Sequence, residues 1–149
     1  MVNIVMSNSE LGLQEQLIAL IRAFGLHRPD QTPCGKPVAV AEAHALMELA
    51  QGAPLSQNDL VARLQLEKST VSRLVGILET RGWIVRARSA QDGRARELRL
   101  TDTGRQITAD LAEARRTKFA RVFEAIPEEA RAAVLESLQI LVEAMRANK

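Results

Sequence analysis

The residues that suggest a chemistry lie in two neighbouring stretches of this 149-residue chain. The first stretch carries Gln57, Lys68, Ser69, Thr70, Ser72 and Arg73. The second carries Arg86, Arg88, Asp92, Arg94, Arg96 and Arg99. Hydroxyl, amide and guanidinium groups can hydrogen-bond to base edges, and arginines also contact phosphates. Together these residue types indicate recognition of double-stranded DNA.

Positive charge is concentrated in the same part of the chain. Residues 68–99 hold eight Lys or Arg and three Asp or Glu, whereas the remaining residues hold twelve and fifteen, and the whole chain carries +2. A basic segment beside an acidic remainder favours a polyanionic partner. The alternative is a basic hairpin that is only solvated.

Two short helices are predicted to present the first stretch. Ser56 can cap one of them, with Asp59 three positions later, and a second helix is predicted at 68–81, ending before Gly82. The apolar residues of the second helix have the spacing of one buried stripe, formed by Val71, Leu74, Val75 and Leu78. The polar residues between them then lie nearer the opposite face.

A β-hairpin is predicted to present the second stretch. Its strands are expected at 83–88 and 95–100, and Asp92-Gly93 in the intervening turn is a strong turn signal. A helix at about 39–51 precedes these elements, with an inward face formed by Val40, Ala43, Leu46, Met47 and Ala50. Residues 39–101 are therefore predicted to form a winged helix-turn-helix, in a chain that is mainly α with a small β-wing.

Three further helices flank this module, at about 10–26, 102–125 and 128–147. Ser9 is the predicted N-cap of the first helix, Gly25 marks its end, and the proline-containing residues 27–37 form a loop. The element order is thus α-α-α-α-β-β-α-α. Because the flanking apolar stripes have little chain of their own to cover them, we expect 10–26 and 102–147 to form a subunit interface.

Length and composition predict one cytoplasmic domain spanning 1–149. Hydrophobic residues make up 46% of the chain, which is enough for a core. No uncharged apolar run approaches the roughly 18 residues of a membrane helix, and residues 1–9 do not have the pattern of a signal peptide. The single cysteine permits no internal disulfide, which agrees with a reducing compartment.

The sequence resembles the multiple-antibiotic-resistance regulator (MarR) family of bacterial transcription regulators. The residues that carry the resemblance lie at 55–60, 68–75, 78–86, 92–94 and 100–104. The resemblance implies a homodimeric winged-helix regulator in which helix 68–81 enters the major groove and the wing reaches the minor groove. It also implies a near-palindromic operator and, commonly, repression relieved by a small ligand.

The family pattern also implies roles for single residues. Ser69, Thr70, Ser72 and Arg73 would face bases and phosphates, and Arg94 would enter the minor groove at the wing tip. Asp92 would orient an arginine, and Arg86 is the strand arginine near the wing base. Many members have a further basic residue where this chain has Gly93, so its tip carries one charge less. Arg88, Arg96 and Arg99 are phosphate contacts or solvated charges.

Other readings remain open at this point. Cys34 and His44, with Glu42 and His27, could in principle bind a metal, or Cys34 could sense oxidants, although an inert cysteine and no cofactor are the simpler expectation. The resemblance implies a ligand cavity, for which Met47 and Trp83 are candidate lining residues. A winged-helix module that contacts an acidic protein is the main alternative function. An enzyme is disfavoured, because no phosphate-binding glycine loop or nucleophile motif is present.

Overall fold

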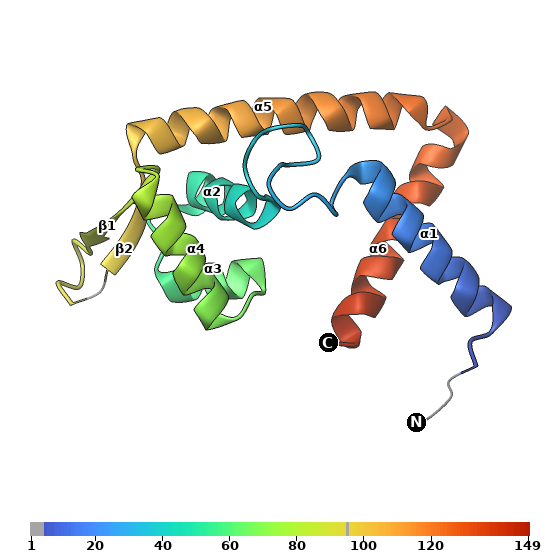
Figure 1. Ribbon diagram of the computed structural model, residues 1–149, viewed down its shortest axis with the longest axis horizontal. Coiled ribbons are helices and arrows are strands. Elements are labelled where there is room, and N and C mark those ends of the chain that lie inside the picture. Colours follow the sequence, from blue (N-terminus) through green and yellow to red (C-terminus); the bar gives the residue numbers. More distant parts are fainter. Residues whose placement is uncertain (1–4, 95) are drawn as a thin grey trace. The chain divides into compact units, whose positions relative to one another are not determined.

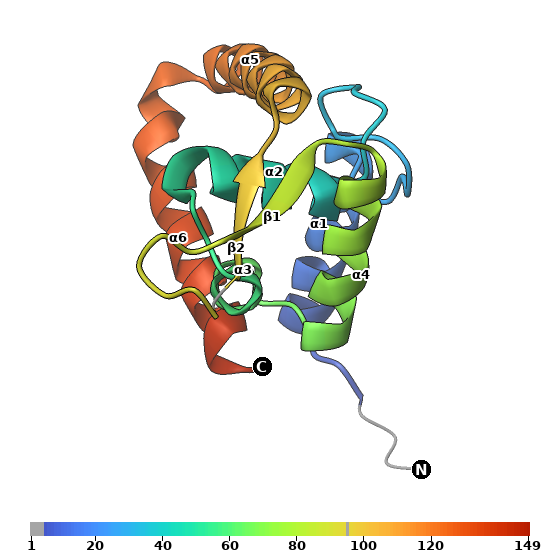
Figure 2. The same cartoon turned by 90° about the vertical axis from the view of Figure 1, so that its left-hand side faces the viewer.

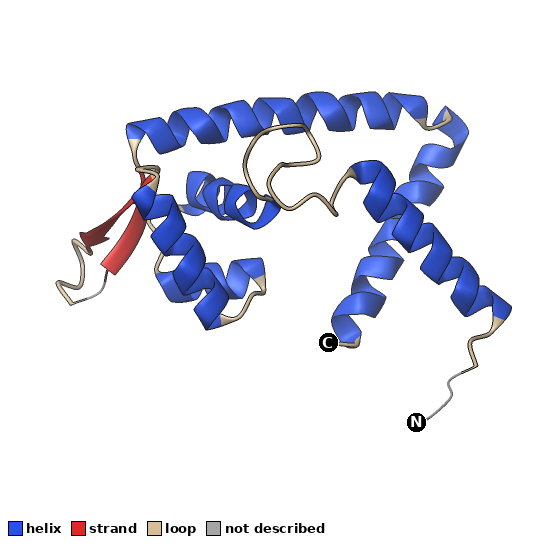
Figure 3. Ribbon diagram, viewed as in Figure 1, coloured by secondary structure: helices blue, strands red, loops and turns tan. Residues whose placement is uncertain are grey.

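The computed structural model describes residues 5–94 and 96–149, so the predicted first residue of the return strand, Ala95, and residues 1–4 lie outside the described part (Figure 1). The chain is mainly helical with one two-stranded hairpin (Figure 3). Contacts within the chain divide it into two compact units, one up to Ala112 and one from Glu113. Within the described ranges, no helix is long and apolar enough to cross a membrane.

The predicted fold class and element order are confirmed. The elements are α1 (Asn8–Phe24), α2 (Val40–Gly52), α3 (Gln57–Leu64), α4 (Lys68–Thr80), β1 (Ile84–Arg88), β2 (Arg96–Leu100), α5 (Asp102–Ala125), η1 (Glu128–Ala130) and α6 (Arg131–Ala147). The predicted last helix is divided, because its first turn is a 3₁₀ turn that follows Pro127. Proline has no N–H to donate and suits the start of such a turn.

The start of α1 differs from the prediction. Ser7, not Ser9, is the N-cap, and its hydroxyl accepts a hydrogen bond from the backbone N–H of Glu10 at 3.3 Å. The Glu10 carboxylate in turn accepts a hydrogen bond from the backbone N–H of Ser7, which completes a capping box. A capping box needs a side chain three residues after the cap that can accept a hydrogen bond, and Ser9 is followed at that distance by Gly12. The left-handed residue Gly25 then ends the helix at Phe24, two residues earlier than predicted.

The predicted cap of α3 is confirmed. The Ser56 hydroxyl accepts from the backbone N–H of Asp59 at 3.0 Å, and the Asp59 carboxylate accepts from the backbone N–H of Ser56 at 2.8 Å. The bond from that backbone N–H holds the pKa of the Asp59 carboxyl below its ordinary value. At its other end α3 stops at Gln65, which has φ +54° and turns the chain toward α4. Local capping thus sets both ends of the first helix of the helix-turn-helix.

The hydrophobic core lies within the first unit. Its buried apolar residues are Val38, Ala43, Ala45, Leu46, Leu49, Leu55, Leu60, Val71, Leu74, Val75, Leu78, Ile84, Leu98, Leu100 and Leu111. All four residues of the predicted α4 stripe are among them. The predicted inward face of α2 was partly wrong, because Ala50 is exposed and Leu49 is fully buried. Helix α2 contacts α3, α4 and β2, so its buried arc is wider than one stripe.

The two strands pair antiparallel, with Ile84 opposite Leu100 at the base and Arg88 opposite Arg96 toward the tip (Figure 2). A further backbone pairing was not predicted from the sequence. Leu55, just before α3, exchanges two hydrogen bonds with Leu98 of β2, at 3.3 Å and 2.6 Å. This bridge ties the base of the hairpin to the helix-turn-helix.

The end of α4, the start of β1 and the start of α5 meet at one point. The Thr101 hydroxyl donates to the carbonyl of Gly82 at 2.7 Å, and its backbone N–H donates to the carbonyl of Trp83 at 3.0 Å. The same hydroxyl accepts from the backbone N–H of Gly104 at 3.0 Å and so caps the start of α5. A Cβ atom at position 104 would overlap the Trp83 carbonyl oxygen, so only glycine fits there.

Replacement of Gly104 by alanine is therefore expected to destabilise the first unit. The new methyl group must displace backbone atoms, and overpacking of this kind costs about 1–3 kcal/mol. Thermal unfolding followed by circular dichroism would measure the loss. Gly76→Ala in α4 is the matched control, because nothing lies within 4 Å of its added Cβ. Equal melting temperatures for the two variants would contradict the close approach.

Candidate nucleic-acid interface

The N-terminal half of α4 presents a cluster of polar side chains to solvent. Lys68, Ser69, Ser72 and Arg73 are exposed and Thr70 is half-buried. Burial of the apolar stripe on the opposite face of the helix forces this arrangement. Among the residues that the structure describes, none of these five side chains has a hydrogen-bond or ion-pair partner. Their donors and acceptors are therefore available to a ligand outside the chain.

Gln57, the remaining residue of the first predicted stretch, is the first residue of α3 and is half-buried.

The first turn of α4 lacks a side-chain cap, because the side chain of its N-cap residue, Glu67, makes no hydrogen bond to that turn. The backbone N–H groups of that turn are thus open to an acceptor. Phosphate oxygens are acceptors that suit the start of a helix.

One face of the hairpin changes from apolar to basic along its length. Side chains of directly paired residues share a face, so Ile84 and Leu100 are followed by Arg86 with Leu98, and then by Arg88 with Arg96. Like charges that lie directly opposite each other destabilise a strand pair. Neither Arg88 nor Arg96 has an ion-pair partner within the described chain. An anion bound from outside would relieve the repulsion between them.

Two other arginines of the hairpin are already paired. Arg86 Nε lies 2.8 Å from a carboxylate oxygen of Glu79 in α4, and Arg99 Nη2 lies 3.1 Å from a carboxylate oxygen of Glu97. The Arg86 pair links the hairpin to α4 through side chains. Arg86 thus connects β1 to α4, whereas Arg88 and Arg96 have no ion-pair partner in the described chain.

The hairpin tip is shaped by short polar side chains. The Ser89 hydroxyl accepts from the backbone N–H groups of Gln91 and Asp92, at 3.2 and 3.3 Å. The Asp92 carboxylate accepts from the backbone N–H of Arg94 at 3.1 Å, so that Asp92 acts on Arg94 through the backbone. The Arg94 guanidinium is exposed. No atom lies within 4 Å of a Cβ built at Gly93, which leaves room for a side chain at this position.

The residues considered for metal binding do not form a site in the described chain. His27 and His44 are exposed, and the Cys34 sulfur lies 3.1 Å from the hydroxyl of Thr32. Glu42 is instead buried next to Arg81. A search of the described residues finds no group of three or more His, Cys, Asp or Glu that could hold an ion.

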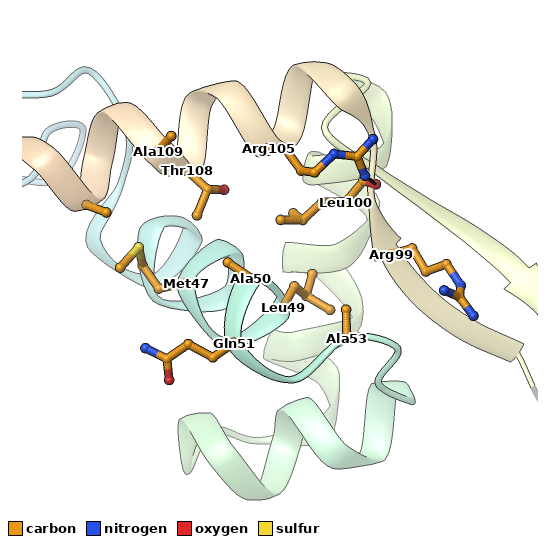
Figure 4. A pocket seen from close by; sticks show the side chains of 11 residues that line it. Met47, Leu49, Ala50, Gln51, Ala53, Arg99, Leu100, Arg105, Thr108 and Ala109 are labelled. Atoms are coloured by element: carbon orange, nitrogen blue, oxygen red, sulfur yellow. Dashed lines mark hydrogen bonds between the residues drawn. The ribbon is translucent and has the colours of Figure 1, made fainter.

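A pocket of about 640 Å³ lies between α2 and the first turns of α5 (Figure 4). Met47 and Thr108 point toward the space between these helices, and Arg105 stands near its β2 end beside Leu100. Met47 was a predicted lining residue. Trp83, the other, is not among the lining residues and stacks on Arg81 instead. Arg105 was not predicted as a lining residue, because only the fold brings it to the same pocket as Met47 of α2.

The guanidinium of Arg105 is held at the start of α5. It donates to the Leu100 carbonyl at 3.0 Å and pairs with the Asp102 carboxylate. This part of the pocket wall is therefore cationic but already partnered, and the rest is largely apolar or small.

Comparisons with known proteins agree with this architecture. Residues 37–95 match the model of the MarR family. A protein of Bacillus subtilis, described as an uncharacterised HTH-type transcriptional regulator, is 28% identical over 108 residues, which are 72% of this chain and 68% of the relative. The structure of Streptococcus pneumoniae FabT in complex with DNA has a TM-score of 0.70 at 23% identity and covers 95% of this chain and 96% of that one.

A second solved structure, the PcaV transcriptional regulator of Streptomyces coelicolor in complex with its natural ligand, has a TM-score of 0.64 at 21% identity. The match covers 97% of this chain and 98% of that chain. At these identities the two structures show a shared fold. With the family match, they confirm the predicted resemblance.

Replacement of Arg88, which lies opposite Arg96 in the hairpin, is expected to raise the stability of the protein and to lower its affinity for DNA. Arg88→Gln is expected to stabilise the protein by about 0.2–1 kcal/mol at low salt, because it removes the repulsion from Arg96, and to weaken binding to duplex DNA. The gain should disappear near 1 M salt, where screening is strong. Thermal melts at two ionic strengths and a fluorescence anisotropy titration with DNA would measure the two effects.

Arg116→Gln is the matched control, because it removes the same charge from an arginine paired with Glu113 in the second unit. It should not raise the melting temperature, and it should change DNA affinity less than Arg88→Gln does. A destabilised Arg88→Gln variant with unchanged DNA binding would contradict the assignment of this pair to a phosphate-binding surface.

Proposed function

We propose that this chain, whose residues 37–95 match the model of the MarR family, acts as a homodimeric repressor that binds a near-palindromic operator in double-stranded DNA. The observation that carries the proposal is the presence of two unpartnered surfaces in one module. One is the polar face of α4, and the other is the basic end of the hairpin. A regulator of this kind works in the cytoplasm and carries out no catalysis.

The two surfaces suit different parts of a DNA duplex. Helix α4 has the dimensions to enter the major groove, where Ser69, Thr70, Ser72 and Arg73 would reach base edges or phosphates. Arg94 at the exposed tip would enter the minor groove, whose potential attracts arginine. Arg88 and Arg96 would contact the phosphates between the grooves. A hairpin that only contacted an acidic protein would leave the α4 cluster without a role.

The proposal of a dimer is supported by two helices, α1 and α6, in which no residue is buried in a single chain. None of the 17 residues of α1 and none of the 17 residues of α6 is buried. Large hydrophobic side chains are exposed on both, namely Leu11, Leu13, Ile18, Leu20 and Ile21 in α1, and Leu135, Leu138, Ile140, Val142 and Met145 in α6. Exposed apolar surface of this extent indicates an interface, and a second copy is the partner the family resemblance supplies.

We further propose that the pocket between α2 and α5 receives a small effector. Its walls are built from α2 and β2 of the winged module and from the α5 helix that leads out of it. A molecule bound there would contact both, and could shift the balance between DNA-binding and non-binding arrangements. The complex of the Streptomyces coelicolor regulator with its natural ligand supports a ligand role in proteins of this fold.

Selection of duplexes from a random-sequence library by the purified chain tests the DNA-binding proposal. The expected product is a near-palindrome with half-site centres about 10 bp, one helical turn, apart. Its affinity should exceed that for a scrambled duplex by at least about a thousandfold at physiological salt, and should fall steeply as salt rises. Selection of no motif would overturn the proposal.

Arg94→Ala locates the wing in that complex. The variant should bind the selected duplex at least about tenfold more weakly, with a smaller salt dependence, because each lost phosphate or groove contact lowers the slope. Its dimer should remain intact. An unchanged affinity would remove the wing tip from the proposed interface.

Leu138→Glu tests the dimer proposal. Leu138 is 44% exposed in the single chain, so the substitution should leave the fold of one subunit unchanged while placing a charge in the interface. Analytical ultracentrifugation should show a dimer for the wild type and a monomer for the variant. Gln139→Glu adds the same charge one position along the helix and should remain dimeric. A dimer of undiminished strength in Leu138→Glu would place the interface elsewhere.

A further inference from the structure

A buried carboxylate lies beside the C-terminal end of α4, away from the proposed DNA-contacting residues. Glu42 of α2 has a side chain that is only 8% exposed, and its Oε2 lies 2.9 Å from Nη1 of Arg81. The contact is an ion pair without the geometry of a hydrogen bond. The Arg81 guanidinium also stacks over the ring of Trp83, 4.8 Å from its centroid. One arginine thus joins α2, the end of α4 and the start of β1.

A buried charge in this position calls for a reason beyond stability. Glu42 is buried but the Arg81 side chain is 39% exposed, and such an ion pair contributes little net stability, because desolvation of the carboxylate offsets the attraction. Its geometry, however, is specific, because loss of Arg81 would leave the buried carboxylate uncompensated. The pair is therefore better suited to holding one arrangement of α4 against α2 than to adding stability.

The same end of α4 is held from the side of α5. Thr101 binds the carbonyls of Gly82 and Trp83, and Gly104 packs directly against the latter. Arg81 and Thr101 therefore both hold the backbone that follows α4, at the junction of α4, β1 and α5 that Figure 1 shows. By contrast, the polar N-terminal half of α4 lies next to α3, at the end of the helix away from this junction (Figure 1).

The C-terminal end of α4 is held by these contacts in addition to the buried stripe, so they help to set the angle at which the helix meets the junction. Ser69 is twelve residues from Arg81, which corresponds to about 18 Å along a helix. A tilt of about 5° at this end would move Ser69 by roughly 1.5 Å, which is more than a hydrogen bond to a base edge tolerates. Long arginine and lysine side chains can follow a phosphate over such a distance, because phosphate contacts are mainly electrostatic.

We infer that Arg81, held by Glu42 and stacked on Trp83, is a positioning residue that sets the angle of α4 and thereby determines sequence discrimination rather than general DNA affinity. The inference rests on the proposed function. Arg81 acts from the C-terminal end of the helix, through the orientation of the residues that read the groove.

The double variant Glu42→Gln/Arg81→Met tests this role. It removes both charges, so that no buried charge is left alone and the net charge of the chain is unchanged. Affinities are measured for two probes, namely the duplex selected by the wild-type chain and a scrambled duplex of the same composition. We expect the ratio of these affinities to fall at least about tenfold, the scale of one good base contact, while the affinity for scrambled DNA stays within about twofold.

A matched control is available in the same module. Glu48 of α2 and Arg63 of α3 form an ion pair at 3.2 Å that does not involve α4. Glu48→Gln/Arg63→Met removes the same two charges and should leave the affinity ratio unchanged. Arg81→Lys, which can keep the ion pair but not the planar stacking, should retain the ratio to within about threefold.

The state of the junction can be read independently of DNA. Trp83 is the single tryptophan and the chain has no tyrosine, so intrinsic fluorescence reports on this ring. Acrylamide quenching should increase in the Glu42→Gln/Arg81→Met variant and not in the control, with unchanged far-ultraviolet circular dichroism. If the double variant does not fold, Glu42→Gln alone provides the test, and its affinity ratio should fall at least about threefold because the charge that holds Arg81 is lost.

Two results would overturn the inference. One is an unchanged affinity ratio in a variant whose Trp83 quenching shows that the junction has opened. The other is a parallel loss of affinity for both duplexes with a smaller salt slope, which would make Arg81 a direct phosphate contact. Failure of the wild-type chain to select any duplex is a different outcome, because it overturns the proposed function itself.

Discussion

The contact between Gly104 and the carbonyl of Trp83 is the constraint on which the arrangement of the winged module depends. Here α5 starts directly against the backbone that joins α4 to β1, with no room for a side chain. Thr101 binds the carbonyls of Gly82 and Trp83 through its hydroxyl and its backbone N–H. Because α4, β1 and α5 meet at the backbone of these two residues, α4 and the hairpin cannot be reoriented independently of the first turn of α5.

The arginines of the winged module fall into two groups, those in ion pairs that connect its elements and those without an ion-pair partner in the described chain. Arg81 and Arg86 are paired with Glu42 and Glu79, and these pairs connect α4 to α2 and to β1. Arg88 and Arg96 lie opposite each other, and neither has an ion-pair partner in the described chain. The polar side chains at the start of α4 have no hydrogen-bond or ion-pair partner there either. The protein alone gains nothing from such a surface. Its two ends are best explained by an anionic partner that spans both.

Local sequence patterns predicted the helices and strands well, but they predicted poorly which elements contact one another. The stripe of α4 and the capping box of Ser56 were correct, because helical periodicity and capping depend on residues within one or two turns. The cap of α1 was misplaced only because the Ser7–Glu10 pair was overlooked. The buried face of α2 was wrong at Ala50 for a different reason. Its burial depends on contacts with α3, α4 and β2, which periodicity within α2 does not contain.

By itself the sequence determined the helix-turn-helix, the hairpin and the separation of basic from acidic segments, since each follows from residues close together in the chain. Only the tertiary structure decided that Arg81 pairs with Glu42 and Arg86 with Glu79, that Leu55 bridges to Leu98, and that Arg105 borders a pocket with Met47. The partners in these contacts are separated by between seven and several tens of residues. Their distances are set by how helices and strands pack, and no local pattern of residue types encodes them.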